Sequence, residues 1–383
     1  MAVKVVLAPD SFKGSISARD LCAALREGVL EVFPDAEVTE LPLADGGEGT
    51  VEALVHATGG RLVERVVRDP LGRPVRAAYG VLGDGQTAVV EMAQASGLPL
   101  LAPHERNPLI ADSFGTGQLI RDALAAGYRR FIIGLGGSAT NDGGAGALRA
   151  LGVRFLDEAG EELPPGGEAL LRLARVDVTG LDPAVRASRF ILASDVTNPL
   201  CGPNGASAVF GPQKGATPDM VAWLDAALLR FGKVLREATG LDVAALPGSG
   251  AAGGAGAGFM AVLGAEFRSG IEIVMEAVDF GGKIRGADWI VTGEGRLDEQ
   301  TLSGKAVAGV CRLARTAGVP VIGICGSLAL STRQMEELGL AAAFSIVPGP
   351  CPTKEAMKRA GEMARGTMAR VMRLIRSAKG TDG

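Results

Sequence analysis

The amino-acid sequence predicts an α/β protein with two domains. Apolar runs of strand length alternate with amphipathic helical patterns along most of the chain, as they do in α/β folds. The chain has 383 residues, and a single hydrophobic core seldom serves more than about 250–300 residues. Hydrophobic residues make up 47% and aromatic residues 4%, a composition that suits a well-buried core with many tight turns.

The N-terminal segment has the pattern of two strands that alternate with two helices. Val3–Leu7 is a short apolar strand pattern, and Ser17 is a candidate N-cap for a helix that ends near Phe33. Val38–Leu43 predicts a second strand, and the turn ADGGEGT leads into a helix that ends near Ala57. The chain therefore opens as strand, helix, strand, helix.

The pattern then changes to that of an antiparallel sheet. Leu62–Arg68 mixes apolar and charged residues, and a turn follows at Pro70–Gly72. Further strand patterns cover Val75–Leu82 and Thr87–Met92. We assign these strands to a second domain.

The rest of the chain returns to α/β alternation. Helices are predicted at Gly115–Ala126, from Ala145, at Asp219–Thr239 and at Lys354–Arg376, and strands at Phe131–Gly134 and Phe190–Ala193. The strand Trp289–Thr292, the helix Ser303–Thr316 and the strand Val319–Cys325 form a crossover, which implies parallel pairing.

Composition and charge exclude several classes of function. The net charge is -4 and aromatic side chains are few, so binding of nucleic acid is disfavoured. The five cysteines form no CxxC pair, which favours a reducing compartment, and we expect a cytoplasmic protein. His56 and His104 alone leave little material for a histidine metal site or a Ser-His triad.

No segment has the pattern of a membrane span or an export signal. Lys4 and Pro9 interrupt the apolar run at the N-terminus, so it lacks the apolar core of a signal peptide. The uncharged stretch Val243–Ala265 is dominated by glycine and alanine and contains Pro247, so we interpret it as a loop that enters a helix. We therefore expect small-molecule partners and no membrane.

The loop after the first strand is a candidate anion site. Asp10, Ser11 and Lys13 stand ahead of a helix, whose N-terminal amides favour a carboxylate or a phosphate. Ligands of open α/β sheets bind beyond the carboxyl ends of strands, which is where these residues fall. An ordinary capped turn with a surface lysine is the structural alternative.

The loop ADGGEGT sets two acids beside two glycines. Gly46 permits close approach of the backbone to a ligand, and Asp45 and Glu48 are suited to hold substrate hydroxyls. The structural alternative is a helix-entry turn whose acids complement the helix dipole.

The segment GLGGSATNDGGAG, residues 134–146, is the strongest candidate for binding phosphate. A buried strand runs into small residues, a hydroxyl and further glycines at the start of a helix, which is typical of phosphate-binding loops. The candidate residues are Gly136, Gly137, Ser138, Asn141 and Asp142.

The same loop also supports a rival function. Gly134, Gly136 and Ala139 match the dinucleotide fingerprint after a strand, and Asp157 follows at about the expected twenty residues. An NAD-dependent dehydrogenase of a small hydroxy acid is therefore an alternative. The same expression recurs in Gly248–Gly253 with no strand before it, so a glycine-rich chain produces this pattern readily.

Two further strand ends carry acids and a lysine. Asp195 is suited to act as a general base or a metal ligand, Lys214 to neutralise a transferring phosphate, and Asn198 to hold substrate. Glu294 and Asp298 follow a later strand, and clustered acids at a strand end suit magnesium. Turns and helix caps are the structural alternative in both loops.

Six long blocks follow one another along the chain. They are DSFKGSISA, ADGGEGT, GLGGSATNDGGAG, SDVTNPLCGPNGAS with FGPQKGA, GAAGGAGAGF and TGEGRLDEQTLSGK. In wording and order they resemble the glycerate kinase family of the bacterial glycerate 2-kinase type. The resemblance extends from about Lys4 to about Ile375 and is far more specific than a single fingerprint.

The resemblance implies transfer of the γ-phosphoryl group of ATP to D-glycerate with Mg²⁺, and it favours the 2-position as acceptor. It also implies a flavodoxin-like or Rossmann-like domain with a parallel sheet, facing a mixed α/β domain across a cleft. The first domain is expected to comprise residues 1–60 and 281–383, and the second residues 61–280, although residues 115–150 could belong to either. We expect a monomer or a homodimer, and a non-catalytic binding protein is a third alternative.

Roles for individual residues follow from this resemblance. Asp195 is expected to orient or deprotonate the glycerate hydroxyl, while Lys13, Asp45 and Lys214 gather the substrate and the transferring phosphoryl group. The phosphates of ATP would rest on the amides of residues 136–138, with the acids of the later strand near Mg²⁺. The expected substrate-binding residues are Asp10, Ser11, Asp45, Gly46, Glu48 and Asn198.

Overall fold

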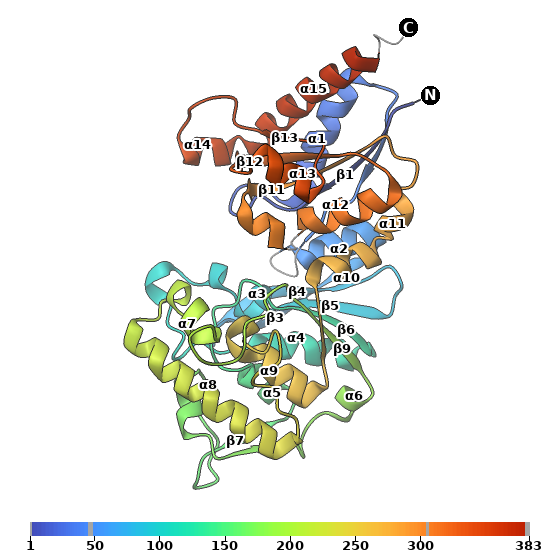
Figure 1. Ribbon diagram of the computed structural model, residues 1–383. Helices are drawn as coiled ribbons and strands as arrows, with labels where there is room; N and C mark the ends of the chain where they lie inside the picture. Colours follow the sequence, from blue (N-terminus) through green and yellow to red (C-terminus); the bar gives the residue numbers. More distant parts are fainter. Residues whose placement is uncertain (1, 45–48, 304–305, 380–383) are drawn as a thin grey trace. The chain divides into compact units, whose positions relative to one another are not determined.

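The chain forms two compact units (Figure 1). The computed structural model describes residues 2–44, 49–303 and 306–379. The first unit consists of Met1–Asp45 and Ile271–Gly383, and the second of Gly46–Gly270, so the second is inserted into the first along the chain. The domain limits expected from the sequence, and the cleft, stay predictions.

The first unit is built on a parallel sheet. Its strands are β1 (Lys4–Pro9), β2 (Glu37–Glu40), β11 (Trp289–Leu297), β12 (Val321–Leu328) and β13 (Ala342–Ser345). All neighbours pair in parallel, in the order β13-β12-β11-β1-β2. Numbered within the unit this order is 2-1-3-4-5, the flavodoxin-like arrangement. The expected flavodoxin-like domain with a parallel sheet is therefore confirmed.

Helices cover this sheet, and the first and last of them pack together. The helices are α1 (Ala18–Val32), α10 (Gly270–Ala277), α11 (Phe280–Lys283), the 3₁₀ helix η5 (Glu299–Ser303), α12 (Ala306–Ala317), α13 (Thr332–Leu338), α14 (Thr353–Lys358) and α15 (Ala360–Lys379). α1 begins as expected, since the Ser17 side chain accepts a hydrogen bond from the Asp20 amide at 3.1 Å. α1 and α15 lie side by side (Figure 1), and Leu25 and Met368 belong to one buried cluster between them.

Two expectations about this unit were wrong in detail. Lys354–Arg376 forms two helices, α14 and α15, because the backbone at Arg359 leaves the helical region (φ −105°, ψ 17°). β2 ends at Glu40, short of the expected Leu43. The Leu43 amide nevertheless donates to the carbonyl oxygen of Pro9 at 2.9 Å, so the extended chain still follows β1.

The second unit contains a mixed sheet. Its strands are β3 (Arg61–Arg68), β4 (Pro74–Val81), β5 (Thr87–Glu91), β6 (Arg130–Gly134), β9 (Arg189–Ala193) and β10 (Glu266–Arg268), with β7 (Arg154–Leu156) and β8 (Arg175–Asp177) as a separate antiparallel pair. The order is β10-β9-β6-β5-β4-β3, parallel from β10 to β5 and antiparallel from β5 to β3. The antiparallel strands and the mixed α/β character expected of this domain are confirmed.

Helices connect the strands of the second unit. They are α2 (Thr50–Thr58), α3 (Met92–Ser96), η1 (Leu98–Leu100), η2 (Pro103–Glu105), α4 (Phe114–Ala125), α5 (Ala145–Ala150), η3 (Glu168–Arg172), α6 (Pro183–Arg186), α7 (Ala206–Phe210), η4 (Pro212–Lys214), α8 (Pro218–Thr239) and α9 (Ala251–Leu263). The uncharged stretch from Val243 is a loop that enters α9, as expected. Within the described ranges, every helix is too short or too polar to cross a membrane.

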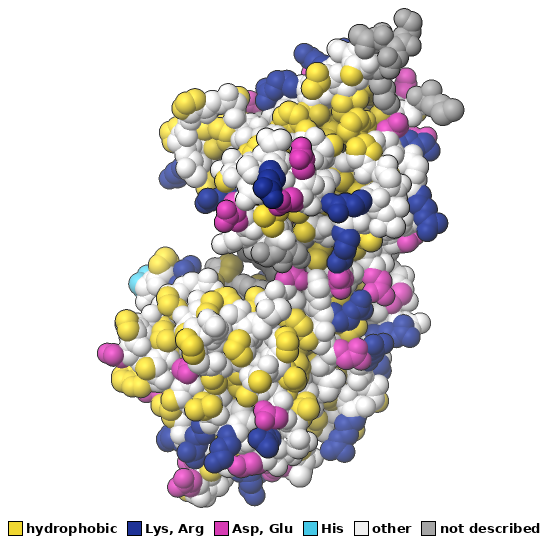
Figure 2. All heavy atoms as spheres, viewed as in Figure 1, with side chains coloured by type: hydrophobic (Ala, Val, Ile, Leu, Met, Phe, Trp, Pro, Cys, Tyr) yellow, Lys and Arg dark blue, Asp and Glu magenta, His cyan; other side chains and the backbone are white. Residues whose placement is uncertain are grey.

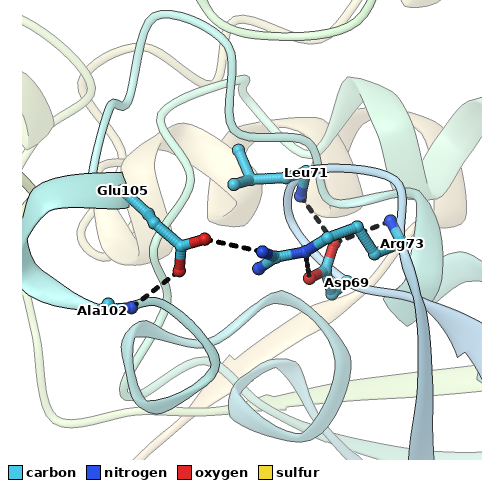
Figure 3. Close-up of polar contacts among 5 residues, drawn as sticks. All are labelled: Asp69, Leu71, Arg73, Ala102 and Glu105. Atoms are coloured by element: carbon cyan, nitrogen blue, oxygen red, sulfur yellow. Dashed lines mark hydrogen bonds and ion pairs between the residues drawn. The ribbon is translucent and has the colours of Figure 1, made fainter.

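An ion-pair network fixes the turn between β3 and β4 (Figure 3). The Asp69 carboxylate accepts hydrogen bonds from the amides of Leu71 and Arg73, each at 2.9 Å. It also accepts one from Arg73 Nε at 2.6 Å. Arg73 Nη1 pairs with Glu105 at 2.6 Å, and the other Glu105 oxygen accepts from the Ala102 amide at 2.9 Å. The turn is thereby tied to the segment that leads into α4.

Charged side chains of both signs are interspersed on the face shown in Figure 2. Hydrophobic and uncharged side chains lie between them, on both units. Neither the basic nor the acidic side chains form one continuous patch on that face. A surface of this kind exerts no strong long-range field on a polyanion.

Gly28→Ala is expected to destabilise the first unit, because α1 and α15 approach closely at this residue. A Cβ atom at position 28 would lie 2.5 Å from the carbonyl oxygen of Arg365 and 2.8 Å from Met368 Cβ, so the helices would have to move apart. Overpacking of this kind costs about 1–3 kcal/mol. The measurement is the free energy of unfolding in urea, followed by circular dichroism.

Gly366→Ala in α15 is the matched control. A Cβ atom there would meet no other atom within 4 Å, so the change should be neutral or stabilise the helix by up to about 1 kcal/mol. Equal free energies of unfolding for the two variants would contradict the close approach at Gly28.

Candidate active site

The first unit contains a cavity of about 650 Å³ at the carboxyl ends of its strands. Five residues that the sequence singled out line it, namely Asp10, Ser11, Lys13, Glu294 and Asp298. They follow β1 or belong to the end of β11, two strands that are neighbours in the sheet. The chain connections leave β1 and β11 in opposite directions here, and such a switch point is the usual ligand position in open α/β sheets.

The loop after β1 is held by backbone hydrogen bonds. Asp10 is 6% exposed, and its amide donates to the carbonyl oxygen of Gly293 at 2.8 Å. Asp10 Oδ1 accepts from the Ser11 amide at 2.6 Å. Lys13 is exposed to solvent at the same cavity. The acid is therefore fixed in place, while the lysine charge lies where a dissolved anion can reach it.

Protein donors orient the two acids at the end of β11, of which Asp298 directly follows the strand. Glu294 Oε1 accepts from Thr301 Oγ1 at 2.7 Å. Asp298 accepts from the Gln300 amide at 2.9 Å and pairs with Arg296 Nε at 3.0 Å. No group of three or more metal-ligating side chains occurs within the described residues. The acids fit Mg²⁺ in its nucleotide-bound form, which takes one or two carboxylates together with phosphate oxygens and waters.

Three parallel strands of the second unit bring a second group of residues together. Glu91 at the end of β5 pairs with Gly134 of β6, which pairs with Ala193 of β9. Neighbouring strands are about 4.8 Å apart, so these three strand ends lie within about 10 Å. Glu91, the glycine-rich loop after β6 and Asp195 after β9 therefore share one edge of the sheet.

The first turn of the glycine-rich loop presents three successive amides. Those of residues 136–138 donate to no acceptor in the part of the chain that the structure describes. The turn is fixed on both sides, since the carbonyl oxygen of Gly137 accepts from the Leu98 amide at 2.9 Å and the Ala139 amide donates to Ser96 at 2.8 Å. Successive amides of this kind form an anion-binding site.

Lys214 contacts the same loop from within the protein. It is 2% exposed, and its Nζ donates to Ser138 Oγ at 3.0 Å and to the carbonyl oxygen of Thr140 at 2.6 Å. Burial lowers the pKa of Lys214 to about 7, and the nearby Asp142 carboxylate partly opposes this shift. An anion bound at the loop would favour the charged form of the lysine.

Asn141 and Asp142 are buried and hydrogen-bonded to other parts of the protein. The Asp142 carboxylate accepts from the amide and the hydroxyl of Ser113, at 3.0 and 2.7 Å, and from the Gly144 amide at 3.1 Å. Asn141 Nδ2 donates to Ser207 Oγ at 3.0 Å. The described contacts of both residues thus stabilise the loop on which the three amides lie.

Asp195 is oriented by the segment after β10, whereas Asn198 supports its own loop. Asp195 Oδ1 accepts from Ser269 Oγ at 2.7 Å and from the Gly270 amide at 3.1 Å. Asn198 Nδ2 donates to the carbonyl oxygen of Asn204 at 2.8 Å. The carboxylate of Asp195 is thereby held at the sheet edge that also carries the glycine-rich loop.

Sequence reasoning missed Glu91. Its side chain is 1% exposed, and Oε1 accepts from the Val51 amide at 2.6 Å. It therefore caps α2, whose N-cap residue Gly49 has no side chain to do so. Burial raises the pKa of Glu91 to about 7, although backbone hydrogen bonds from Val51 and Gly49 lower it. An acid at the end of an apolar strand was the available signal, the same one that identified Asp195.

Asp112 is a second acid that the sequence did not reveal. Burial raises its pKa, and the neighbouring Asp142 carboxylate adds to the effect. Two carboxyl groups close together inside a protein cannot both ionise cheaply, which favours the protonated form of Asp112.

Three residues singled out from the sequence, Asp45, Gly46 and Glu48, lie outside the described residues. Their expected role in holding substrate hydroxyls stays a prediction. The structure resumes at Gly49, immediately before α2.

Carboxylates, lysines and open loop amides lie at strand ends of this protein, and related proteins identify its class as phosphotransferases with an alcohol acceptor. The glycerate kinase family matches residues 5–376. The glycerate kinase of Bacillus subtilis strain 168 is 51% identical, over 98% of this chain and 99% of its own length. This chain therefore belongs to the glycerate kinase family.

Two further relatives agree with this assignment. The glycerate 2-kinase of Escherichia coli K12 is 47% identical over 94% of this chain and 94% of its own length. A crystal structure assigned as glycerate kinase 2 of Salmonella typhimurium LT2 is 48% identical, with a TM-score of 0.88, and the match covers 99% of this chain and 100% of that chain. The expected family and fold class are confirmed, and the dehydrogenase alternative has no support among these relatives.

Glu91→Gln is expected to remove part of the pH dependence of stability. The pKa of Glu91 is raised from 4.5 to about 7 in the folded protein, so the folded state binds this proton more tightly than the unfolded state. The resulting stabilisation, on the order of 3 kcal/mol, is present below about pH 4.5 and is lost as the pH rises through about 7. Glutamine keeps an acceptor for the Val51 amide but carries no titrating proton.

The measurement is the free energy of unfolding between about pH 5 and 8, where the variant should lose less stability than the wild type. Glu64→Gln, on the exposed face of β3, is the matched control and should keep the wild-type pH dependence. If both variants follow the wild-type curve, Glu91 does not hold its proton in the folded protein.

Proposed function

We propose that this protein transfers the γ-phosphoryl group of ATP to D-glycerate and yields 2-phospho-D-glycerate and ADP. Membership of the glycerate kinase family carries the proposal. The 2-position is favoured by the relative from Escherichia coli, whose name is glycerate 2-kinase. Acids, lysines and open amides at the strand ends of both units supply the groups that phosphoryl transfer needs.

Asp195 is the proposed general base. The C2 hydroxyl oxygen attacks the γ-phosphorus, the bond from this phosphorus to the bridging oxygen of ADP breaks, and the hydroxyl proton passes to the Asp195 carboxylate. The hydrogen bonds from Ser269 and Gly270 to Oδ1 fix the carboxylate in one orientation. A fixed carboxylate within reach of the hydroxyl favours this proton transfer.

The glycine-rich loop is the proposed holder of the transferring phosphoryl group. The amides of residues 136–138 donate to its oxygens, and Lys214 adds a positive charge behind Ser138. Because Lys214 is buried, its charge acts in a medium of low dielectric constant and is weakly screened by water. Most of the rate enhancement then comes from positioning and charge neutralisation.

The first unit contributes the remaining groups. We propose that Lys13, Asp10 and Ser11 contact bound anions and hydroxyls, and that Glu294 and Asp298 hold Mg²⁺. When bound, Mg²⁺ neutralises charge on the phosphate oxygens of ATP. Asn198, Asn141 and Asp142 act by keeping their loops in place.

The proposed setting is the cytoplasm. All five cysteines are unpaired thiols, which agrees with a reducing compartment. The proposed partners are ATP and D-glycerate, for a monomer or a homodimer.

The direct test is an assay with purified protein, ATP, Mg²⁺ and D-glycerate, in which phosphorus NMR identifies the product. We expect 2-phosphoglycerate together with ADP, and no phosphoglycerate when L-glycerate replaces D-glycerate. Formation of 3-phosphoglycerate would retain the kinase and reverse the regiochemistry. Absence of any phosphorylated acid would refute the proposed reaction.

Asp195→Asn is expected to lower kcat by about 10²- to 10⁴-fold, because an amide cannot accept the hydroxyl proton. The KM for ATP should change little, since Asp195 is proposed to act on the acceptor. Asp219→Asn, on the exposed first turn of α8, is the matched control and should keep the wild-type kcat. A wild-type kcat for Asp195→Asn would remove this residue from the mechanism.

A further inference from the structure

We propose that the cavity of the first unit binds the nucleoside part of ATP, with the base against the apolar side chains of Val347 and Met357. The proposal rests on the proposed function, because it assigns a location to one of the two substrates. It concerns the first unit alone.

The residues that line the cavity have two kinds of chemistry. Asp10, Lys13, Glu294 and Asp298 are charged, whereas Val347, Ala356 and Met357 of the segment 346–360 are apolar. A ligand that suits both kinds of residue must have an apolar, flat or bulky part and a charged, oxygen-rich part. A nucleoside triphosphate has both, with the base at one end and the phosphates at the other.

The volume of the cavity suits a nucleotide better than it suits D-glycerate. The cavity has a volume of about 650 Å³, in the middle of the range of about 300–1,000 Å³ found for pockets that enclose drug-sized ligands. D-glycerate is a three-carbon acid with an oxygen on every carbon, so it would leave most of this volume to water. It also has no apolar surface to cover Val347 or Met357. The cavity therefore fits ATP better than the acceptor.

Hydrogen bonds hold the apolar segment that lines the cavity in place. The Ser15 hydroxyl donates to the carbonyl oxygen of Met357 at 2.7 Å, which ties the loop after β1 to α14. The Ile346 amide donates to the carbonyl oxygen of Cys325 in β12 at 2.8 Å. The Val347 amide donates to Ser345 Oγ at 3.1 Å. A preformed pocket binds without the entropy cost of ordering its walls.

The position of the cavity agrees with this assignment. It lies at the β1–β11 neighbour pair, the switch point of a sheet with the order 2-1-3-4-5. In sheets of this order the switch point between the first and third strands receives a mononucleotide cofactor. The two acids proposed to hold Mg²⁺ lie at the same strand ends, as the phosphates of a bound nucleotide require.

Cys351 provides a direct readout, because it is half-buried and lines the cavity. The experiment measures the rate at which iodoacetamide alkylates Cys351 in the wild-type protein, by mass spectrometry. ATP or ADP at ten times the dissociation constant should slow this rate by about tenfold, since only the unoccupied fraction reacts. Adenosine at saturating concentration should also protect, whereas inorganic triphosphate and D-glycerate should not.

Glutathione added to every sample is the reference thiol and should be alkylated at the same rate in each. Protection of Cys351 by D-glycerate but not by ATP would overturn the proposal, and so would equal protection by inorganic triphosphate and ATP. The protection of Cys351 from alkylation reports binding alone and does not require phosphoryl transfer. A protein that shows nucleotide protection but forms no phosphoglycerate would refute the proposed reaction and keep the nucleoside site.

A pair of variants tests whether the apolar side chains of the cavity contact ATP. Val347→Trp fills the apolar side of the cavity and should raise the KM for ATP at least tenfold while the KM for D-glycerate stays unchanged. Val66→Trp, on the exposed face of β3, is the matched control and should alter neither value. A change confined to the KM for D-glycerate in Val347→Trp would place the acceptor in this cavity and refute the inference.

Discussion

The pairing of β1 with β11 is the interaction on which the rest of the structure depends. It joins the N-terminal strand to residues 289–293, which follow the inserted second unit in the sequence. Within the pair, Thr292 Oγ1 donates to the carbonyl oxygen of Ala8 at 2.8 Å. One residue beyond β1, the Asp10 amide donates to the carbonyl oxygen of Gly293 at 2.8 Å. The entropy cost of closing a loop rises only slowly with its length, so a complete folded unit can be inserted at this position. The acids of the cavity become neighbours only through this pairing.

In the second unit, buried charged groups hold the functional loop in one shape. A charge inside a protein is tolerated only when hydrogen bonds compensate for its lost hydration. Lys214 meets this condition through Ser138 and Thr140, and Asp142 meets it through Ser113 and several loop amides. These contacts fix the backbone between them. The three amides at the start of the loop are therefore oriented before any anion arrives, and preorganisation of this kind lowers the cost of stabilising a transition state.

The order of strands and helices could be predicted from the sequence. The alternation of apolar residues in a strand and their recurrence every three to four residues in a helix are both local patterns. The same patterns mark strand ends, and this was enough to identify Asp10, Glu294 and Asp195. Two features were not predicted. Glu91 ends an apolar strand and so carried the same signal, but the cap that it forms on the helix of residues 50–58 is a contact between separate segments that no local pattern encodes. The apolar side chains that line the cavity come from residues 346–360, whose sequence indicates only a turn and a helix.

The glycine-rich loop explains why its motif could not decide the function. A Cβ atom at Gly143 would collide with the ring of Phe231, and one at Gly146 with the carboxylate of Asp112. Close packing therefore requires both glycines whatever the loop binds. Gly143 and Gly146 lie outside the dinucleotide fingerprint, but they belong to the pattern of residues 134–146 that predicted a phosphate-binding loop. That pattern cannot separate close packing from contact with a ligand. Membership of the glycerate kinase family separates them, because it rests on a match along residues 5–376 and not on one loop.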